Sequence, residues 1–161
     1  MFYKASLDNL AKIITVFISI LSSVIFSLSL HAVLINGKVT DYFGLIGIIP
    51  IYLIVYLLRP TGYLITRDEI VVCRFLSKIK IKREEIVNIE CIDKQDIPAS
   101  IRTFASGGFW GYFGTFYNSE LGYMQWYITR KDKIILIRTN ADKYIMLSPD
   151  ERSGFLSRMG Q

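Results

Sequence analysis

The hydrophobic positions of this chain follow two different patterns, which meet near residue 60. Residues from Ile13 to Ile35 form a run of 23 without a formal charge, and those from Tyr42 to Leu58 form a second run of 17. Because a helix rises about 1.5 Å per residue, the first run can cross a hydrocarbon core of roughly 30 Å. The second run is at the short end of the length that a membrane span needs. A short polar turn joins the runs, so the pattern predicts two membrane spans, at 13–35 and 42–58, in an antiparallel hairpin.

Beyond residue 60 the pattern changes to period two or to short apolar runs, which is typical of β-strands. The segment 78–82 alternates strictly between Lys and Ile, which places Ile on the core side and Lys in water. We expect about seven short antiparallel strands, at 63–66, 70–75, 78–82, 86–92, 123–129, 134–139 and 143–148.

A short helix is expected after the last strand. Ser148 and Glu151 have the spacing of a capping box, and Pro149 stands at the favoured first helical position. The chain therefore divides into an N-terminal segment with the membrane hairpin, at 1–59, and a mainly-β domain with one C-terminal helix, at 60–161. The helix presents three apolar side chains on one side, where they would close one end of a β-barrel: Phe155, Leu156 and Met159.

The charges follow the same division of the chain. Only five of the 33 charged side chains lie in residues 1–58, and most of the net charge of +5 belongs to the β domain, where basic and acidic residues alternate. Lys and Arg lie before the first span and after the second, at the ends away from the connecting turn. The positive-inside rule therefore places both termini and the β domain in the cytoplasm. The flanking residues are Lys4, Lys12, Arg59, Arg67 and Arg74, against Lys38 alone in the turn.

Few residues suggest chemistry. His31 is the only histidine and lies inside the first span, while Cys73 and Cys91 are the only cysteines and lack metal-ligand spacing. The sequence has no phosphate loop and no nucleophile–base pair, and Asp93 and Asp96 form an ordinary solvated pair. We therefore expect no metal, no cofactor, no nucleic-acid partner and no enzyme activity.

The least ordinary segment is 103–119, which has 17 residues, no charge, four glycines and seven aromatic side chains. Its glycines do not have the spacing of a dinucleotide-binding loop. Three interpretations stay open: a third membrane span, a long hairpin whose rings pack on the domain, or an exposed loop that contacts a partner or the lipid interface. An exposed loop would make that contact through Phe109, Trp110, Tyr112 and Phe113, with Arg102 beside them to pair with an anionic group.

Seven strands followed by one helix is the element order of a pleckstrin-homology (PH) domain. A Gly-Tyr-Leu-Ile-Thr opening at 62–66, directly after a hydrophobic hairpin, resembles membrane-anchored bacterial PH-like domain proteins. So do the segment 100–114, which runs from Ser-Ile-Arg-Thr-Phe into Ser-Gly-Gly-Phe-Trp-Gly-Tyr-Phe-Gly, and Leu-Ser-Pro-Asp at 147–150. The resemblance spans roughly residues 60–159 and implies a PH-like fold, a place in the bacterial inner membrane, and a scaffold for protein or ligand interaction. A five-stranded OB barrel is the competing fold, but it leaves two strands over.

Two functions are consistent with these patterns. The first is a non-enzymatic interaction module, anchored in the lipid bilayer, that presents the Gly/aromatic segment to a protein partner or to the lipid interface. The alternative is a small structural or regulatory subunit of a membrane protein complex, which uses the transmembrane hairpin as its contact. A stoichiometric membrane partner would favour the second, and transient soluble partners would favour the first.

Overall fold

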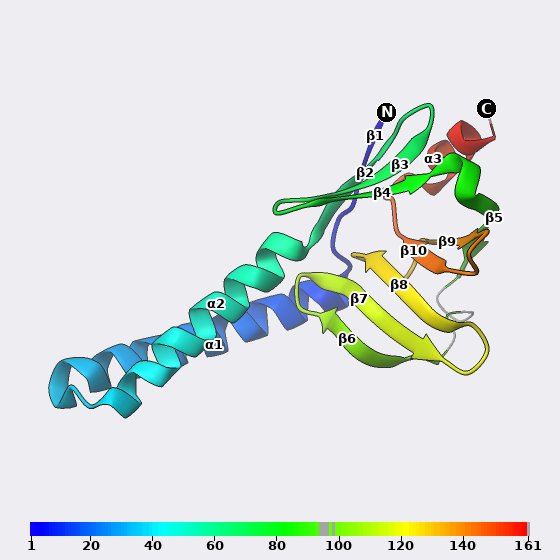
Figure 1. The fold of residues 1–161 in the computed structure, drawn as a ribbon. Coiled ribbons are helices and arrows are strands. Elements are labelled where there is room, and N and C mark those ends of the chain that lie inside the picture. The colour runs from blue at the N-terminus through cyan, green and yellow to red at the C-terminus, as the bar shows by residue number, and fades with distance from the viewer. Residues whose placement is uncertain (94–96, 98, 161) are drawn as a thin grey trace.

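The computed structural model describes residues 1–93, 97 and 99–160, in which two helices project from one side of a β-rich domain (Figure 1). The helices are α1 (Asn9–Asn36) and α2 (Phe43–Leu58), linked by the 3-10 turn η1 (Val39–Tyr42), and α3 (Arg152–Met159) follows the last strand. A second 3-10 turn, η2 (Arg83–Glu85), joins two strands. The strands are β1 (Phe2–Lys4), β2 (Pro60–Ile65), β3 (Glu69–Arg74), β4 (Lys78–Lys82), β5 (Ile86–Ile92), β6 (Ile101–Gly108), β7 (Gly111–Asn118), β8 (Gly122–Ile128), β9 (Ile134–Thr139) and β10 (Tyr144–Leu147).

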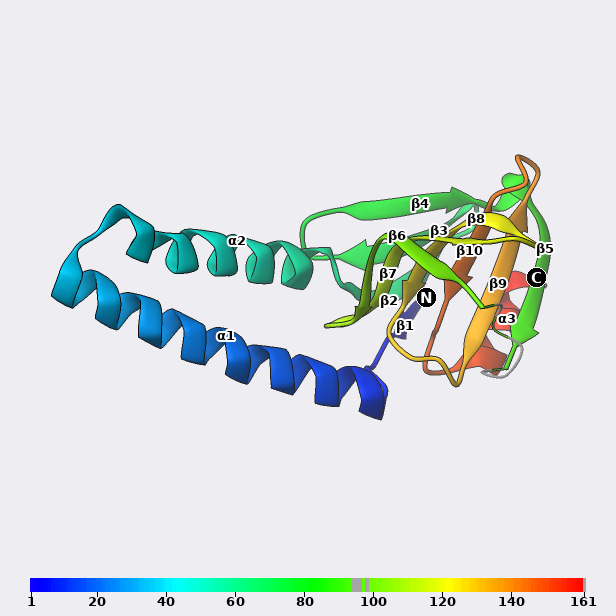
Figure 2. The ribbon, with the colours of Figure 1, turned by 90° about the horizontal axis from the view of Figure 1, so that it is seen from below.

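The two apolar runs of the sequence lie in α1 and α2. Asp8 caps α1 through its carboxylate, which accepts a hydrogen bond from the backbone N–H of Ala11 at 2.7 Å. α2 runs back toward the domain, and the hydroxyls of Ser19 and Tyr52 lie 2.8 Å apart between the helices (Figures 1 and 2). In the described part of the chain, α1, with 28 residues, is the one helix long and apolar enough to cross a membrane, and α2, with 16, is shorter.

The β domain contains two sheets. The four-stranded sheet has the order β1-β2-β3-β4, and the six-stranded sheet has the order β5-β9-β10-β8-β7-β6. The seven strands expected from the sequence correspond to β2 to β5 and β8 to β10, because their alternating or β-branched runs match the pleat. Two expectations are corrected: β10 pairs with β8 in parallel, and the described strands form two open sheets instead of a closed barrel.

A buried cluster of aromatic and aliphatic side chains lies under the four-stranded sheet. Phe155 of α3 is fully buried there, with its ring 5.3 Å from that of Tyr3 and 6.3 Å from that of Tyr63, centroid to centroid. Leu156 and Met159 pack against the same cluster, so the predicted apolar side of the C-terminal helix is confirmed.

The predicted capping box does not form. α3 begins at Arg152, and Glu151 precedes it without a side-chain cap. The hydroxyl of Ser148 instead accepts a hydrogen bond from the backbone N–H of Thr129 at 2.9 Å, deep in the domain. Ser148 is therefore a buried connector between two strands, and the residues after it continue as coil before the helix starts.

The N-terminal strand β1 was not expected from the sequence. It pairs antiparallel with β2, with Tyr3 opposite Tyr63, ahead of the long helix. Residues before and after the two helices thus belong to one sheet, although the proposed division at residue 59 separates them in sequence. Because β1 has only three residues, it is too short to show a periodic pattern and escapes detection in the sequence.

Candidate functional site

The Gly/aromatic segment is a β-hairpin made of β6 and β7, which lies in the chain between β5 and β8. The strands pair antiparallel from Ile101 opposite Tyr117 to Gly108 opposite Gly111. β7 also pairs with β8. The hairpin therefore extends the six-stranded sheet at its edge, and of the three interpretations the structure has the long hairpin.

The tip of the hairpin contacts α2. The ring of Phe109 lies 5.1 Å from that of Tyr52, and the ring of Trp110 lies 5.1 Å from that of Tyr56, both edge to face and measured between centroids. The guanidinium carbon of Arg59 lies 4.3 Å from the Trp110 ring centroid, a cation–π distance. The tip and the domain-proximal turns of α2 therefore form one aromatic and cationic cluster.

The same tip also contacts α1. The backbone N–H of Trp110 donates to the hydroxyl of Thr15 at 2.9 Å, and Thr15 is only 6% exposed. Trp110 has a φ of 59°, a left-handed conformation that costs a bulky residue about 1–3 kcal/mol. Gly108 has a φ of 129°, and a Cβ there would collide with Ile14 of α1. The tip conformation is thus fixed by its contact with the helix.

Tyr112 and Phe113 point to opposite faces of the hairpin, and both are buried. Tyr112 is 2% exposed, and its hydroxyl donates to the Asp8 carboxylate at 3.2 Å. Burial raises the pKa of the Tyr112 phenol above its ordinary value, and the charge of Asp8 raises it further. Phe113 is 6% exposed, so neither ring is free to reach a partner in this structure.

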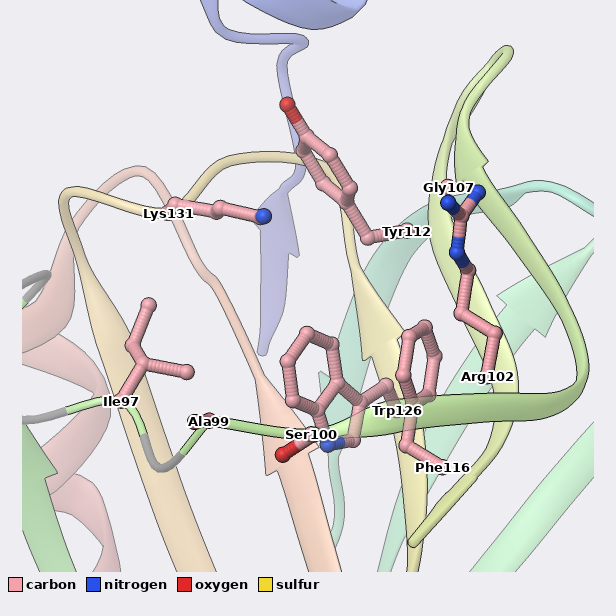
Figure 3. Close-up of a pocket in the computed structure, with 9 residues that line it drawn as sticks. All are labelled: Ile97, Ala99, Ser100, Arg102, Gly107, Tyr112, Phe116, Trp126 and Lys131. Atoms are coloured by element: carbon pink, nitrogen blue, oxygen red, sulfur yellow. The ribbon is translucent and has the colours of Figure 1, made fainter. Parts of the chain in front are cut away.

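A pocket of about 420 Å³ opens on the Tyr112 face of the hairpin (Figure 3). Arg102 and Lys131 stand on opposite sides of it, with the stacked rings of Phe116 and Trp126 between them. The described residues that line it are Ile97, Ala99, Ser100, Arg102, Gly107, Tyr112, Phe116, Trp126 and Lys131.

A larger groove of about 640 Å³ lies on the Phe113 face, between the hairpin and α2. Its walls are mostly apolar and include Ile54, Leu58 and the exposed ring of Phe104. Arg74 also lines it, and the buried Nε of this guanidinium has no hydrogen-bond partner among the described residues. Burial lowers the pKa of Arg74 from its ordinary value.

The structure therefore separates the five residues singled out in the sequence. Phe109 and Trp110 contact the helices, Arg102 and Tyr112 line the pocket, and Phe113 faces the groove. The residues that complete these sites come from outside the Gly/aromatic segment, and their distance along the chain hides them from sequence reasoning. The missed residues are Tyr52, Tyr56, Arg59, Trp126 and Lys131.

The described residues contain no group of three or more His, Cys, Asp or Glu side chains that could hold a metal ion. Comparison with curated proteins and with solved structures gave no match. A family model described as bacterial PH domain matches residues 61–161, which include the hairpin, the pocket and α3. This chain belongs to the bacterial PH domain family.

Proposed function

We propose that this protein is a membrane-anchored interaction module of the bacterial cell membrane, whose β6–β7 hairpin rests at the lipid interface. PH-like domains are generally non-catalytic interaction modules, which supports a binding role over an enzymatic one. α1 and α2 act as the two spans of the anchor, and both termini and the β domain face the cytoplasm. The excess of Lys and Arg at the domain side of the helices supports this orientation.

One observation carries the proposal: the hairpin tip packs on the end of α2 that enters the domain. Tyr52 and Tyr56 lie in the last two turns of α2, and Arg59 follows directly. Tyr, Trp and Arg side chains concentrate where a helix leaves the hydrocarbon core, because their apolar parts stay in lipid while their polar atoms reach headgroups. Phe109 and Trp110 join this belt from the β domain, which holds the domain against the bilayer surface.

Trp110 provides a direct test, because the chain has only two tryptophans, Trp110 and Trp126. In a Trp126→Phe variant of the full chain, reconstituted in phosphatidylcholine bilayers, Trp110 is the only tryptophan. We expect lipids brominated near the headgroup to quench its emission more strongly than lipids brominated near the chain end.

The matched control is Trp110→Phe, in which the buried Trp126 reports. Its emission should change little with either brominated lipid, because Trp126 is 3% exposed within the β domain. Unquenched Trp110, or quenching strongest from the bilayer centre, would contradict the proposed position of the hairpin.

The groove beside α2 supports a second candidate, a small structural or regulatory subunit of a membrane complex. Ile54 and Leu58 of α2 face this groove together with Phe104, which is 87% exposed. A helix of a membrane partner would cover such an apolar surface. Extraction in a mild detergent distinguishes the two: a stoichiometric membrane partner, lost on Phe104→Ser, would favour the subunit.

A further inference from the structure

We infer that the pocket in Figure 3 binds an organic anion with a flat apolar body, the anionic group lying between Arg102 and Lys131 and the body against Trp126. A phosphate or carboxylate carried on an aromatic or acyl group has this chemistry. The inference deepens the proposed binding role and rests on it. It is tested through Trp126, whereas the membrane position is tested through Trp110, so either can fail alone.

The size and floor of the pocket suit such a body. Its volume of about 420 Å³ falls within the usual range for small-molecule sites, about 300–1,000 Å³. The rings of Phe116 and Trp126 stack with centroids 3.9 Å apart and planes 17° from parallel, and they are 4% and 3% exposed. This rigid pair gives a flat apolar surface against which a ring or a short chain can pack.

The walls of the pocket supply positive charge. Arg102 comes from β6 and Lys131 from the connection between β8 and β9, and their side chains approach the pocket from two sides (Figure 3). The ammonium of Lys131 lies 4.5 Å from the ring centroid of Tyr112. Among the described residues that line the pocket, the two charged side chains, Arg102 and Lys131, are both basic.

The carboxylate of Asp8 lies beside the lining residue Tyr112, and it is already engaged. It accepts hydrogen bonds from the N–H groups of Ala11 and Lys131 at 2.7 and 3.2 Å, and from the Tyr112 hydroxyl. With three donors satisfied from within the chain, this carboxylate is not available to replace a ligand between Arg102 and Lys131.

Gly107 leaves room for the Arg102 side chain. The guanidinium lies directly over Gly107, where a Cβ would overlap Nη1. Among the described residues Arg102 makes no ion pair, and its guanidinium lies against the bare backbone of Gly107. Any larger residue at 107 would displace the guanidinium while leaving its charge.

Trp126 contributes an independent sign of a ligand. Its indole N–H is buried and has no hydrogen-bond acceptor among the described residues. Burying an unpaired donor is unfavourable, and exceptions in folded proteins call for an explanation. In Figure 3 this nitrogen lies at the edge of the ring beside Ser100, away from Arg102 and Lys131, so a polar atom on the body of a ligand would supply the missing acceptor.

The test uses the full chain in a non-ionic detergent with the Trp110→Phe change, so that Trp126 is the only tryptophan. We expect phenyl phosphate to change Trp126 emission in a saturable way. Inorganic phosphate, which lacks the ring, and benzyl alcohol, which lacks the charge, should each bind at least about tenfold more weakly, since each loses one half of the contact.

Variants locate the binding. Arg102→Gln and Lys131→Gln should each weaken phenyl phosphate binding at least about tenfold, because a charge-assisted hydrogen bond is lost. Gly107→Ala should weaken it as well without a change of charge. Lys78→Gln, at an exposed site in the other sheet, removes the same charge and should have no effect.

The inference fails if phenyl phosphate gives no saturable change, or if binding survives both Arg102→Gln and Lys131→Gln. If phenyl phosphate binds as expected, an experiment in nanodiscs distinguishes the two sources of the anion. Loss of phenyl phosphate binding when phosphatidylglycerol replaces phosphatidylcholine assigns the site to an anionic lipid headgroup. Binding that is the same in both lipids assigns it to a soluble anion, and each result supports the site.

Discussion

The backbone N–H of Trp110 donates a hydrogen bond of 2.9 Å to the hydroxyl of Thr15, which joins the tip of the β6–β7 hairpin to the first turns of α1. Trp110 holds a left-handed φ of 59° at this point. The same hairpin tip packs edge to face against α2, so both helices meet the β domain at one place. A change in how the helices pack would therefore reach the hairpin and, through it, the walls of the pocket and the groove.

Replacing Thr15 with Val should loosen this junction. The side chains have similar shapes, but Val has no acceptor, and leaving a buried N–H unpaired costs about 1–3 kcal/mol. We expect the Trp110 amide to exchange with deuterium at least about tenfold faster, as measured by residue-resolved hydrogen exchange. Thr15→Ser keeps the hydroxyl and should retain protection; equal protection in Thr15→Val would show that packing alone fixes the tip.

Asp8 joins the start of α1 to the hairpin through the Tyr112 hydroxyl. Asp8→Ala removes the helix cap as well, so we expect it to lower the free energy of unfolding by about 0.5–2 kcal/mol from the cap alone. Asp8→Asn keeps an acceptor for the N–H of Ala11 and should retain most of that stability. Thermal unfolding followed by circular dichroism measures both, and an Asp8→Ala variant as stable as the wild type would contradict the assigned cap.

The buried phenol of Tyr63 should make the protein less stable at alkaline pH. Burial raises the pKa of its phenol to about 12, although hydrogen bonds with Ser148 oppose the shift. The folded state therefore keeps this proton while an unfolded tyrosine loses it above pH of about 10. Stability should fall with rising pH between about 10 and 12, by about 1.4 kcal/mol per pH unit for this group.

The Tyr63→Phe variant isolates that effect. It lacks the ionising group, so its free energy of unfolding should fall less steeply over the same pH range. The variant will also be less stable at neutral pH, because the Ser148 N–H loses the Tyr63 hydroxyl, which accepts its hydrogen bond at 2.9 Å in the wild type. If denaturant titrations show that the free energy of unfolding falls equally steeply with pH in the two proteins above pH of about 10, Tyr63 is not the cause of the alkaline loss of stability.

The sequence predicts those elements best whose side chains alternate or repeat. The Lys–Ile alternation at 78–82 gives β4 with the expected bounds, and the apolar side of the last helix places Phe155 in the core. The hairpin at 101–118 was one of three open interpretations and was not predicted as two strands, because its glycines interrupt the pattern and most of β7 is buried on both faces. The segment therefore lacks the alternation of apolar and polar residues by which strands are recognised.

The candidate site shows a different limit. Arg102 and the nearby aromatic residues stand out in the sequence because they are neighbours in the chain. The pocket, however, pairs Arg102 with Lys131, and the tip contacts come from Thr15 and Tyr56. Such pairings depend on strand register and on the entry of the helices into the domain, which no local pattern specifies.

Asp150 connects the N-terminal segment to the β domain and should be sensitive to acid. Its carboxylate accepts hydrogen bonds from the Ser6 hydroxyl at 2.6 Å and from the Arg130 guanidinium at 3.2 Å. Burial raises the pKa of the Asp150 carboxyl, but these hydrogen bonds outweigh it and hold the pKa below its ordinary value. The stabilisation is therefore present above the unfolded pKa of about 3.9 and is lost as pH falls through the folded pKa.

Replacing Asp150 with Asn should remove both the charge and this acid dependence. We expect the free energy of unfolding at pH of about 7 to fall by about 2 kcal/mol, the scale of hydrogen bonds to a charged group. Asp142→Asn is the matched control, because Asp142 pairs with Arg138 at 2.7 Å but its side chain is 75% exposed, and such surface pairs contribute about 0–1 kcal/mol. If the two variants lose equal stability, or if Asp150→Asn unfolds in acid with the wild-type pH dependence, Asp150 does not hold the N-terminal segment through its charge.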